Sequence, residues 1–137
     1  MWRQKEIVLK PRVRGIHLVT NEILQELPPL PNIGLLNLFI KHTSAALSIN
    51  ENADPDVRVD MEYILDNLVP DVDPNYVHNM EGPDDASSHT KTSIIGPSLT
   101  IPITMGRLNL GTWQGIYLWE FREYMSARHI LSTITGE

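Results

Sequence analysis

The histidines and acidic residues are the side chains of this sequence that are best suited to chemistry. His42, His78 and His89 are the first group, and imidazole is a common ligand for zinc and other divalent metals. Asp84 or Asp85 could complete the coordination, and so could Glu51. We therefore expect a divalent metal ion, Mg or Zn, with His42, His78, His89 and Asp85 as ligands. Ligands so far apart follow no spacing rule, so the alternative that each histidine is a surface or hydrogen-bonded core residue stays open.

Glu51 is the carboxylate that the expected local structure explains least. Asp54 precedes a proline at the start of a helical pattern and is suited to cap that helix, and Asp56 complements the helix dipole. Glu51 stands between two asparagines, just beyond an apolar strand, and strand ends are where functional side chains collect on rigid scaffolds. We predict Glu51 as a ligand or a general base.

The start of the helix predicted after Asp85 is a second candidate site. Free backbone N–H groups there, with Ser87, Ser88 and Lys91, could hold a phosphate. An ordinary capping arrangement is the alternative. The adjacent Asp84 and Asp85 would repel an anion unless a divalent cation lay between them, so the pattern favours a metal and a phosphate together.

A third candidate is the stretch Thr112-Trp113-Gln114, which glycines flank on both sides. Counting by twos from Leu108 places Gln114 on the core face, where an unpaired amide would cost about 1 to 3 kcal/mol. Glycine inside a strand often marks a bulge, so Gln114 either binds something or leaves the core row. Trp113 could supply a stacking face and Gln114 an amide for a heteroaromatic ring, although a tryptophan is more often simply a core residue.

Apolar alternation and helical spacing predict the elements that position these side chains. The expected strands are 6–10, 13–19, 33–40, 45–49, a hairpin 99–104 and 108–118 around a turn at Met105-Gly106, and 129–135, which we pair with 116–123. The expected helices are 20–27, capped by Thr20, then 54–68, and 85–95 capped by Asp84 or Asp85. Residues 70–85 have no usable period, and we expect a lid or binding loop there. The predicted fold is α+β, a mixed and largely antiparallel sheet or a two-sheet sandwich with a few peripheral helices.

Length and composition limit the classes of protein. The 137 residues fit a single domain, 1–137, with one core. A formal charge of −6 disfavours nucleic acid, because lysine and arginine supply most of that affinity. No apolar run reaches the roughly 18 residues of a membrane helix, and the first residues do not lead into a signal-peptide core, so we expect no membrane partner and a cytoplasmic protein. The absence of cysteine excludes disulfides and thiolate chemistry.

Four sequence blocks resemble the YjbQ-like family, whose members have been described as secondary thiamine-phosphate synthases. The blocks are His42-Thr43-Ser44-Ala45-Ala46, Asn50 to Val57, Glu81-Gly82-Pro83-Asp84-Asp85 with His89, and Gly96 to Ile116 with Leu110-Gly111-Thr112-Trp113-Gln114-Gly115-Ile116. The resemblance covers nearly the whole chain. It implies a homotrimer, with sites at subunit junctions where dispersed polar residues meet.

The resemblance also implies a reaction, in which aminopyrimidine methyl diphosphate and a thiazole phosphate form thiamine phosphate and diphosphate. Such a transferase would bind a small phosphorylated heterocyclic substrate and would use a divalent cation against the charge of the diphosphate. Two further functions stay open: a metal-dependent hydrolase of another phosphorylated metabolite, and a non-enzymatic small-ligand binding module. The roles expected for the transferase are catalytic for Glu51, His89 and Gln114, and substrate-binding for Asn50, Ser88, Lys91, Thr112 and Trp113.

Overall fold

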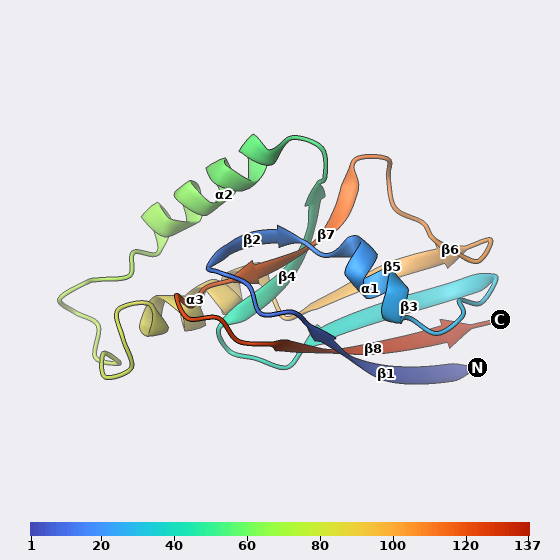
Figure 1. The fold of residues 1–137 in the computed structure, drawn as a ribbon, viewed down its shortest axis with the longest axis horizontal. Helices are drawn as coiled ribbons and strands as arrows, with labels where there is room; N and C mark the ends of the chain where they lie inside the picture. Colours follow the sequence, from blue (N-terminus) through green and yellow to red (C-terminus); the bar gives the residue numbers. More distant parts are fainter.

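A computed structural model describes residues 1–137, which form eight strands and three helices (Figure 1). In chain order the elements are β1 (Trp2–Leu9), β2 (Gly15–Leu18), α1 (Thr20–Glu26), β3 (Ile33–Ile40), β4 (Ala45–Glu51), α2 (Pro55–Leu68), α3 (Asp85–Ile95), β5 (Ser98–Thr104), β6 (Arg107–Leu108), β7 (Gln114–Glu120) and β8 (Arg128–Gly136). No helix of the structure combines the length and the apolar character needed to cross a membrane. Residues 69–84 contain neither helix nor strand, as the sequence predicts.

The strands form two antiparallel sheets, which confirms the predicted α+β class. One sheet has five strands in the order β1-β8-β3-β5-β6, and the other has three in the order β2-β7-β4. The two chain termini lie close together at one end of the five-stranded sheet, and α2 and the loop that follows it extend from the opposite side of the molecule (Figure 1). Helix α2 and residues 69–84 therefore lie far from the termini.

Strand β7 is buried on both faces because its side chains divide between two apolar clusters. Ile116 and Leu118 belong to the larger cluster, which also holds the inward side chains of β1, β3, β5 and β8. Tyr117, Trp119 and the following Phe121 belong to a smaller cluster with Leu65 of α2. Successive side chains of a strand point to opposite faces, so the three-stranded sheet lies between the larger sheet and the helices α2 and α3, whereas α1 packs Ile23 into the larger cluster.

Helix α2 begins as its sequence predicts. The Asp54 side chain accepts a hydrogen bond from the Asp56 backbone N–H at 2.9 Å, and Pro55 occupies the first helical turn. Only Leu65 of this helix is buried. The prediction that Thr20 caps α1 is wrong, since Thr20 is the first helical residue and its hydroxyl accepts a hydrogen bond from the Ile116 N–H at 2.8 Å.

The predicted pairing of the last strand is also wrong. Strand β8 lies between β1 and β3 in the larger sheet, whereas β7 pairs with β2 and β4. The predicted hairpin is correct only at its turn, where Met105 and Gly106 both adopt positive φ and β6 pairs with β5. After Leu108 the chain leaves the larger sheet, so residues 114–118 enter the smaller sheet instead of continuing the return strand.

A buried ion pair joins the two sheets where the chain crosses between them. Arg128 at the start of β8 donates from Nε to Glu120 Oε2, at the end of β7, at 2.6 Å. The same guanidinium donates to the Ser44 carbonyl and hydroxyl oxygens, at 3.2 and 2.9 Å. Both charged side chains are almost fully excluded from solvent. The pair therefore fixes residues 121–127, the segment between β7 and β8 that includes Arg122.

We expect Arg128→Met to lower the free energy of unfolding by about 3 to 5 kcal/mol, because it leaves the Glu120 carboxylate buried without its partner. The measurement is urea unfolding at pH 7. Lys5→Ala, which breaks an exposed ion pair with Glu26, is the control and should cost no more than about 1 kcal/mol. Equal losses in the two variants would contradict the buried pair as a structural anchor.

Candidate functional site

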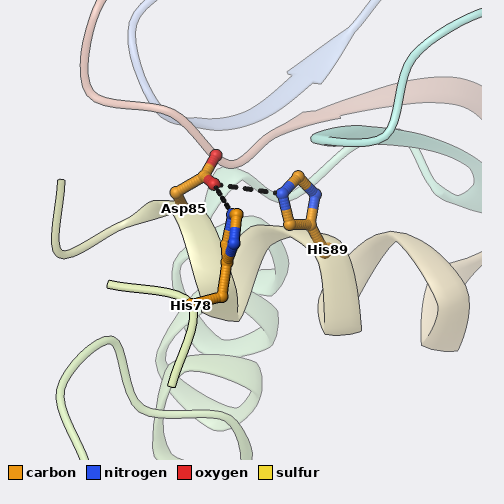
Figure 2. A group of neighbouring side chains, drawn as sticks. All are labelled: His78, Asp85 and His89. Atoms are coloured by element: carbon orange, nitrogen blue, oxygen red, sulfur yellow. Dashed lines mark hydrogen bonds and ion pairs between the residues drawn. The ribbon is translucent and has the colours of Figure 1, made fainter. Parts of the chain in front are cut away.

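Three of the predicted metal ligands meet at the start of α3. His78 from the long loop and Asp85 and His89 from α3 each offer one ligand atom, and these atoms all lie within 4.8 Å of one another. Figure 2 shows both imidazole rings directed at the Asp85 carboxylate. Asp85 Oδ2 lies 2.5 Å from His78 Nε2 and 3.1 Å from His89 Nε2. We call these three residues the histidine–aspartate cluster.

Arg122 holds the carboxylate of the cluster in place. The guanidinium contacts Asp85 Oδ1 through one terminal nitrogen and donates from Nε to Asp84 Oδ2 at 3.2 Å. Its other terminal nitrogen donates to the Glu81 carbonyl oxygen at 2.9 Å. Because Arg122 occupies Oδ1, the second oxygen of Asp85 is left to face the histidines. The Asp85 side chain is only 3% exposed.

The tautomer of His89 follows from its contact with the main chain. His89 Nδ1 lies 2.7 Å from the Thr43 carbonyl oxygen, which can only accept a hydrogen bond, so Nδ1 carries a proton. In the neutral ring Nε2 then presents a lone pair toward the lone pairs of Asp85 Oδ2. That arrangement is stable only if a second proton or a cation lies between the two atoms. A main-chain carbonyl that orients a histidine in this way is typical of metal ligands.

The charge balance around Asp85 favours a cation. Burial would raise the pKa of the Asp85 carboxyl, but the hydrogen bond from His78 and the charges of His89 and Arg122 outweigh burial and hold this pKa below its ordinary value. Asp84 adds a second buried carboxylate, which accepts from the Glu123 N–H at 2.6 Å. Two carboxylates thus face one guanidinium, and the cluster retains a formal negative charge when its histidines are neutral.

The predicted phosphate site at the α3 N-terminus is filled by the chain itself. Ser88 donates to the Asp85 carbonyl oxygen at 2.6 Å, and Lys91 contacts the Asp66 carboxylate and lies 3.9 Å from Asp71 Oδ1. Both side chains are about 1% exposed. The structure therefore places the Ser88 and Lys91 side chains inside the protein, paired with groups of the chain itself.

The remaining predicted residues gather at the opposite end of the three-stranded sheet. Glu51 pairs with Gln114 in the strand register, while Ala45, two residues after Thr43, pairs with Glu120. The six residue steps from Ala45 to Glu51 span about 20 Å at the rise of a β-strand. Within one chain, Glu51 and Gln114 therefore do not reach the histidine–aspartate cluster.

The side chains of Glu51 and Gln114 in this distant group form local hydrogen bonds. Glu51 Oε2 accepts from the Ala53 and Asp54 N–H groups at 3.2 and 2.9 Å, which explains the carboxylate that the sequence left unexplained. Gln114 leaves the core row and accepts from the Gly111 N–H at 2.8 Å. The other members are exposed at the surface: Asn50, Thr112 and Trp113. Trp113 is 64% exposed and is not a core residue.

His42 lies near the cluster without joining it. Its Nε2 accepts a hydrogen bond from the His129 backbone N–H at 2.8 Å, and its ring centroid lies 5.8 Å from that of His129. Burial, followed by the charges of Arg128 and His129, lowers the pKa of His42 below its ordinary value. His42 is thus a neutral imidazole that accepts a hydrogen bond from the main chain, and it is not among the three residues whose ligand atoms lie together.

Open hollows flank the cluster on two sides. His78 lines one of about 390 Å³, formed with the long loop, and His89 lines another of the same volume with His42 and Thr43. His78 and His89 are 53% and 39% exposed. The cluster is consequently accessible to a small molecule from solvent.

Two groups that position the cluster, Arg122 and the Thr43 carbonyl, were not predicted from the sequence. Arg122 was included in an expected strand 116–123, whose charged end carried no special signal. The carbonyl of Thr43 has no side-chain signature at all. Two adjacent aspartates that become buried need a nearby cation, and this requirement is the only signal that could have drawn attention to Arg122.

The fold and the cluster define a two-sheet α+β protein with an accessible histidine–aspartate site. The model of the UPF0047 protein YjbQ-like family matches residues 5–137, and the chain belongs to this family. The UPF0047 protein YjbQ of Escherichia coli O157:H7 is 51% identical over 139 residues, with both chains covered completely. The UPF0047 protein YugU of Bacillus subtilis is 43% identical over 88 residues, or 64% of each chain.

Solved structures share the fold. An uncharacterized conserved protein of the YjbQ/UPF0047 family from Clostridium acetobutylicum superposes with a TM-score of 0.81 at 36% identity, covering 96% of this chain and 99% of that chain. A protein from Sulfolobus solfataricus reaches a TM-score of 0.85 at 23% identity, covering 100% and 99%. The latter likeness concerns the fold alone.

A network centred on Asp71 connects the His78 loop to α3 and to Arg14, the residue before β2. Asp71 accepts from Arg14 at 2.6 and 3.1 Å and from the Ser87 hydroxyl at 2.7 Å. Burial would raise the pKa of Asp71, but the hydrogen bonds from Arg14 and Ser87 and the charges of Arg14 and Lys91 hold it below the ordinary 3.8. The network therefore stabilises the loop that carries His78.

This lowered pKa predicts a pH-dependent contribution to stability. The unfolded chain binds a proton at Asp71 more readily than the folded chain, so the contribution is complete above about pH 3.8 and is lost as the pH falls through the folded value. We expect Asp71→Asn to cost about 1 to 3 kcal/mol in urea unfolding at pH 7 and much less at pH 2.5. A cost that is the same at both pH values would contradict the prediction.

Proposed function

We propose that the histidine–aspartate cluster binds a divalent cation and that the protein uses it to act on a small phosphorylated metabolite. The observation that carries this proposal is the convergence of two imidazole nitrogens on one buried carboxylate oxygen whose partner oxygen is held by Arg122. Two nitrogen donors and one oxygen donor favour zinc over magnesium, which prefers oxygen ligands and water.

The donor set leaves room for a substrate. Three protein ligands with a further open position are typical of catalytic zinc sites, whereas structural sites are closed by four protein ligands. Here the three ligand atoms are flanked by open hollows, and the two histidines are partly exposed. This openness supports a reaction site over a purely structural ion.

The reaction we propose to test first is the one that the family resemblance implies, formation of thiamine phosphate with release of diphosphate. In this reaction the thiazole nitrogen forms a bond to the methylene carbon of the pyrimidine, and the bond from that carbon to the diphosphate oxygen breaks. The diphosphate leaves with the bonding electron pair. A divalent cation, when bound, supplies positive charge close to the departing diphosphate.

In this proposal some residues bind the cation and others orient the residues that bind it. His78, Asp85 and His89 hold the cation, Arg122 fixes the Asp85 carboxylate, and the Thr43 carbonyl keeps the proton of His89 on Nδ1. Glu51, Gln114 and Trp113 take no part within one chain, because they lie at the other end of the sheet. In a homotrimer they could approach the cluster of another copy, so the trimer expected from the resemblance belongs to this proposal, together with the predicted cytoplasmic location.

Hydrolysis of a phosphorylated metabolite is the second candidate. The exposure of His78 and His89 favours it, because water has free access to the cluster. A transferase must exclude that water from its reactive carbon, and a hydrolase need not. A screen of phosphate and diphosphate esters with the zinc-loaded protein separates the two reactions, and no turnover in either assay would favour a small-ligand binding module.

We expect the wild-type protein to bind one zinc ion per chain by isothermal titration calorimetry. Asp85→Asn and His89→Ala should weaken zinc binding at least tenfold, since each removes a ligand of the site. His17→Gln is the matched control, because His17 lies in β2 and its ring contacts the Val13 carbonyl oxygen instead.

Activity is measured on the same samples, by formation of thiamine phosphate and by release of phosphate. The proposal predicts that a chelator abolishes turnover and that added zinc restores it. Full activity in protein shown to be free of metal would contradict the proposal that the reaction needs a cation. Zinc binding that survives both Asp85→Asn and His89→Ala would place the cation elsewhere.

A further inference from the structure

The hollow on the His89 side of the cluster is lined only by residues with a polar side-chain group. It measures about 390 Å³, and its lining residues are His42, Thr43, His89, Thr92 and Ser93. None of these is apolar and none is acidic. His89 belongs both to this hollow and to the histidine–aspartate cluster, so a ligand could occupy the two sites together.

His42 offers this hollow a donor whose state is set by the main chain. The His129 backbone N–H donates to His42 Nε2 at 2.8 Å, and a backbone N–H cannot accept. Nε2 therefore carries a lone pair, and the proton of the ring is on Nδ1. This N–H group has no hydrogen-bond partner within the chain.

The hydroxyl groups of the lining complete a set of donors. Thr43 and Ser93 are exposed, and their hydroxyls form no hydrogen bond within the chain. Thr92 is buried and donates to the Ala45 carbonyl oxygen at 3.3 Å, which holds this wall of the hollow against β4. Hydroxyl and imidazole N–H donors are suited to the oxygens of an anion, and a cation bound between His89 and Asp85 would offset the charge of the adjacent Asp85 carboxylate.

We propose that this hollow binds a phosphoryl group of the substrate, with the His42 Nδ1–H and the Thr43 and Ser93 hydroxyls as donors to its oxygens. The inference rests on the proposed function, because the cation held by His89 would bind the same substrate from the other side. A diphosphate has two phosphoryl groups, one for the cation and one for the hollow. His42, which the sequence suggested as a metal ligand, thus becomes a substrate-positioning residue.

Inorganic diphosphate is the probe, and its dissociation constant is measured by calorimetry with zinc-loaded and metal-free protein. His42→Gln keeps an acceptor near the position of Nε2 for the His129 N–H but removes the donor at Nδ1. We expect it to weaken diphosphate binding about tenfold, as for the loss of one hydrogen bond to a charged group. Zinc affinity should stay unchanged.

Two further variants, each of an exposed hydroxyl, test the same hollow if His42→Gln does not fold. Thr43→Val keeps the carbonyl that orients His89, and Ser93→Ala lies on the exposed side of α3; each should weaken diphosphate binding severalfold. Thr90→Val is the matched control, because Thr90 is an exposed threonine of α3 outside the hollow, and it should bind diphosphate as the wild type does.

The outcomes separate this inference from the proposed function. If zinc binds but diphosphate does not, or if all three hollow variants bind diphosphate within twofold of the wild type, the hollow is not a phosphoryl site and the cation site stands. If the wild type binds no zinc, the proposed function fails. In that case, the hollow would still be supported as a phosphoryl site if its variants weakened diphosphate binding in metal-free protein.

Discussion

The arrangement of the site depends on one interaction, the contact of the Arg122 guanidinium with two adjacent buried aspartates. Asp84 and Asp85 could not both remain ionised away from water without a partner, and Arg122 provides it from the segment that connects the two sheets. The ion pair Glu120–Arg128 fixes that segment. Because Arg122 takes Oδ1 of Asp85, Oδ2 is the oxygen that faces His78 and His89. The position of the candidate ligands thus follows from the way the sheets are joined.

The elements that the sequence predicts best are those with a local physical cause. Asp54 and Pro55 start α2, and Met105-Gly106 forms the β5–β6 turn, because caps and turns depend on residues close in sequence. Strand partners depend on distant residues. The alternating pattern of 116–120 is the same whichever strand lies beside it, so the pairing of β8 with β1 and β3 could not be predicted from periodicity.

The candidate site was predictable in part for the same reason. His78, Asp85 and His89 were suggested by residue type, and the helical spacing of Asp85 and His89 places them one turn apart, but nothing in the sequence shows that the loop brings His78 to them. His42 Nε2 accepts a hydrogen bond from the His129 backbone N–H, and this contact has no sequence pattern. Glu51 resembled a functional carboxylate because its hydrogen bonds to the Ala53 and Asp54 N–H groups are not visible in the sequence.

The proposed function requires a metal ion at the histidine–aspartate cluster. The most direct measurement is an anomalous difference map from crystals grown with zinc, with data collected on both sides of the zinc absorption edge. We expect a zinc peak at about 2.0 to 2.2 Å from His78 Nε2, Asp85 Oδ2 and His89 Nε2. An empty cluster in zinc-saturated crystals, or a peak held by other residues, would contradict the account.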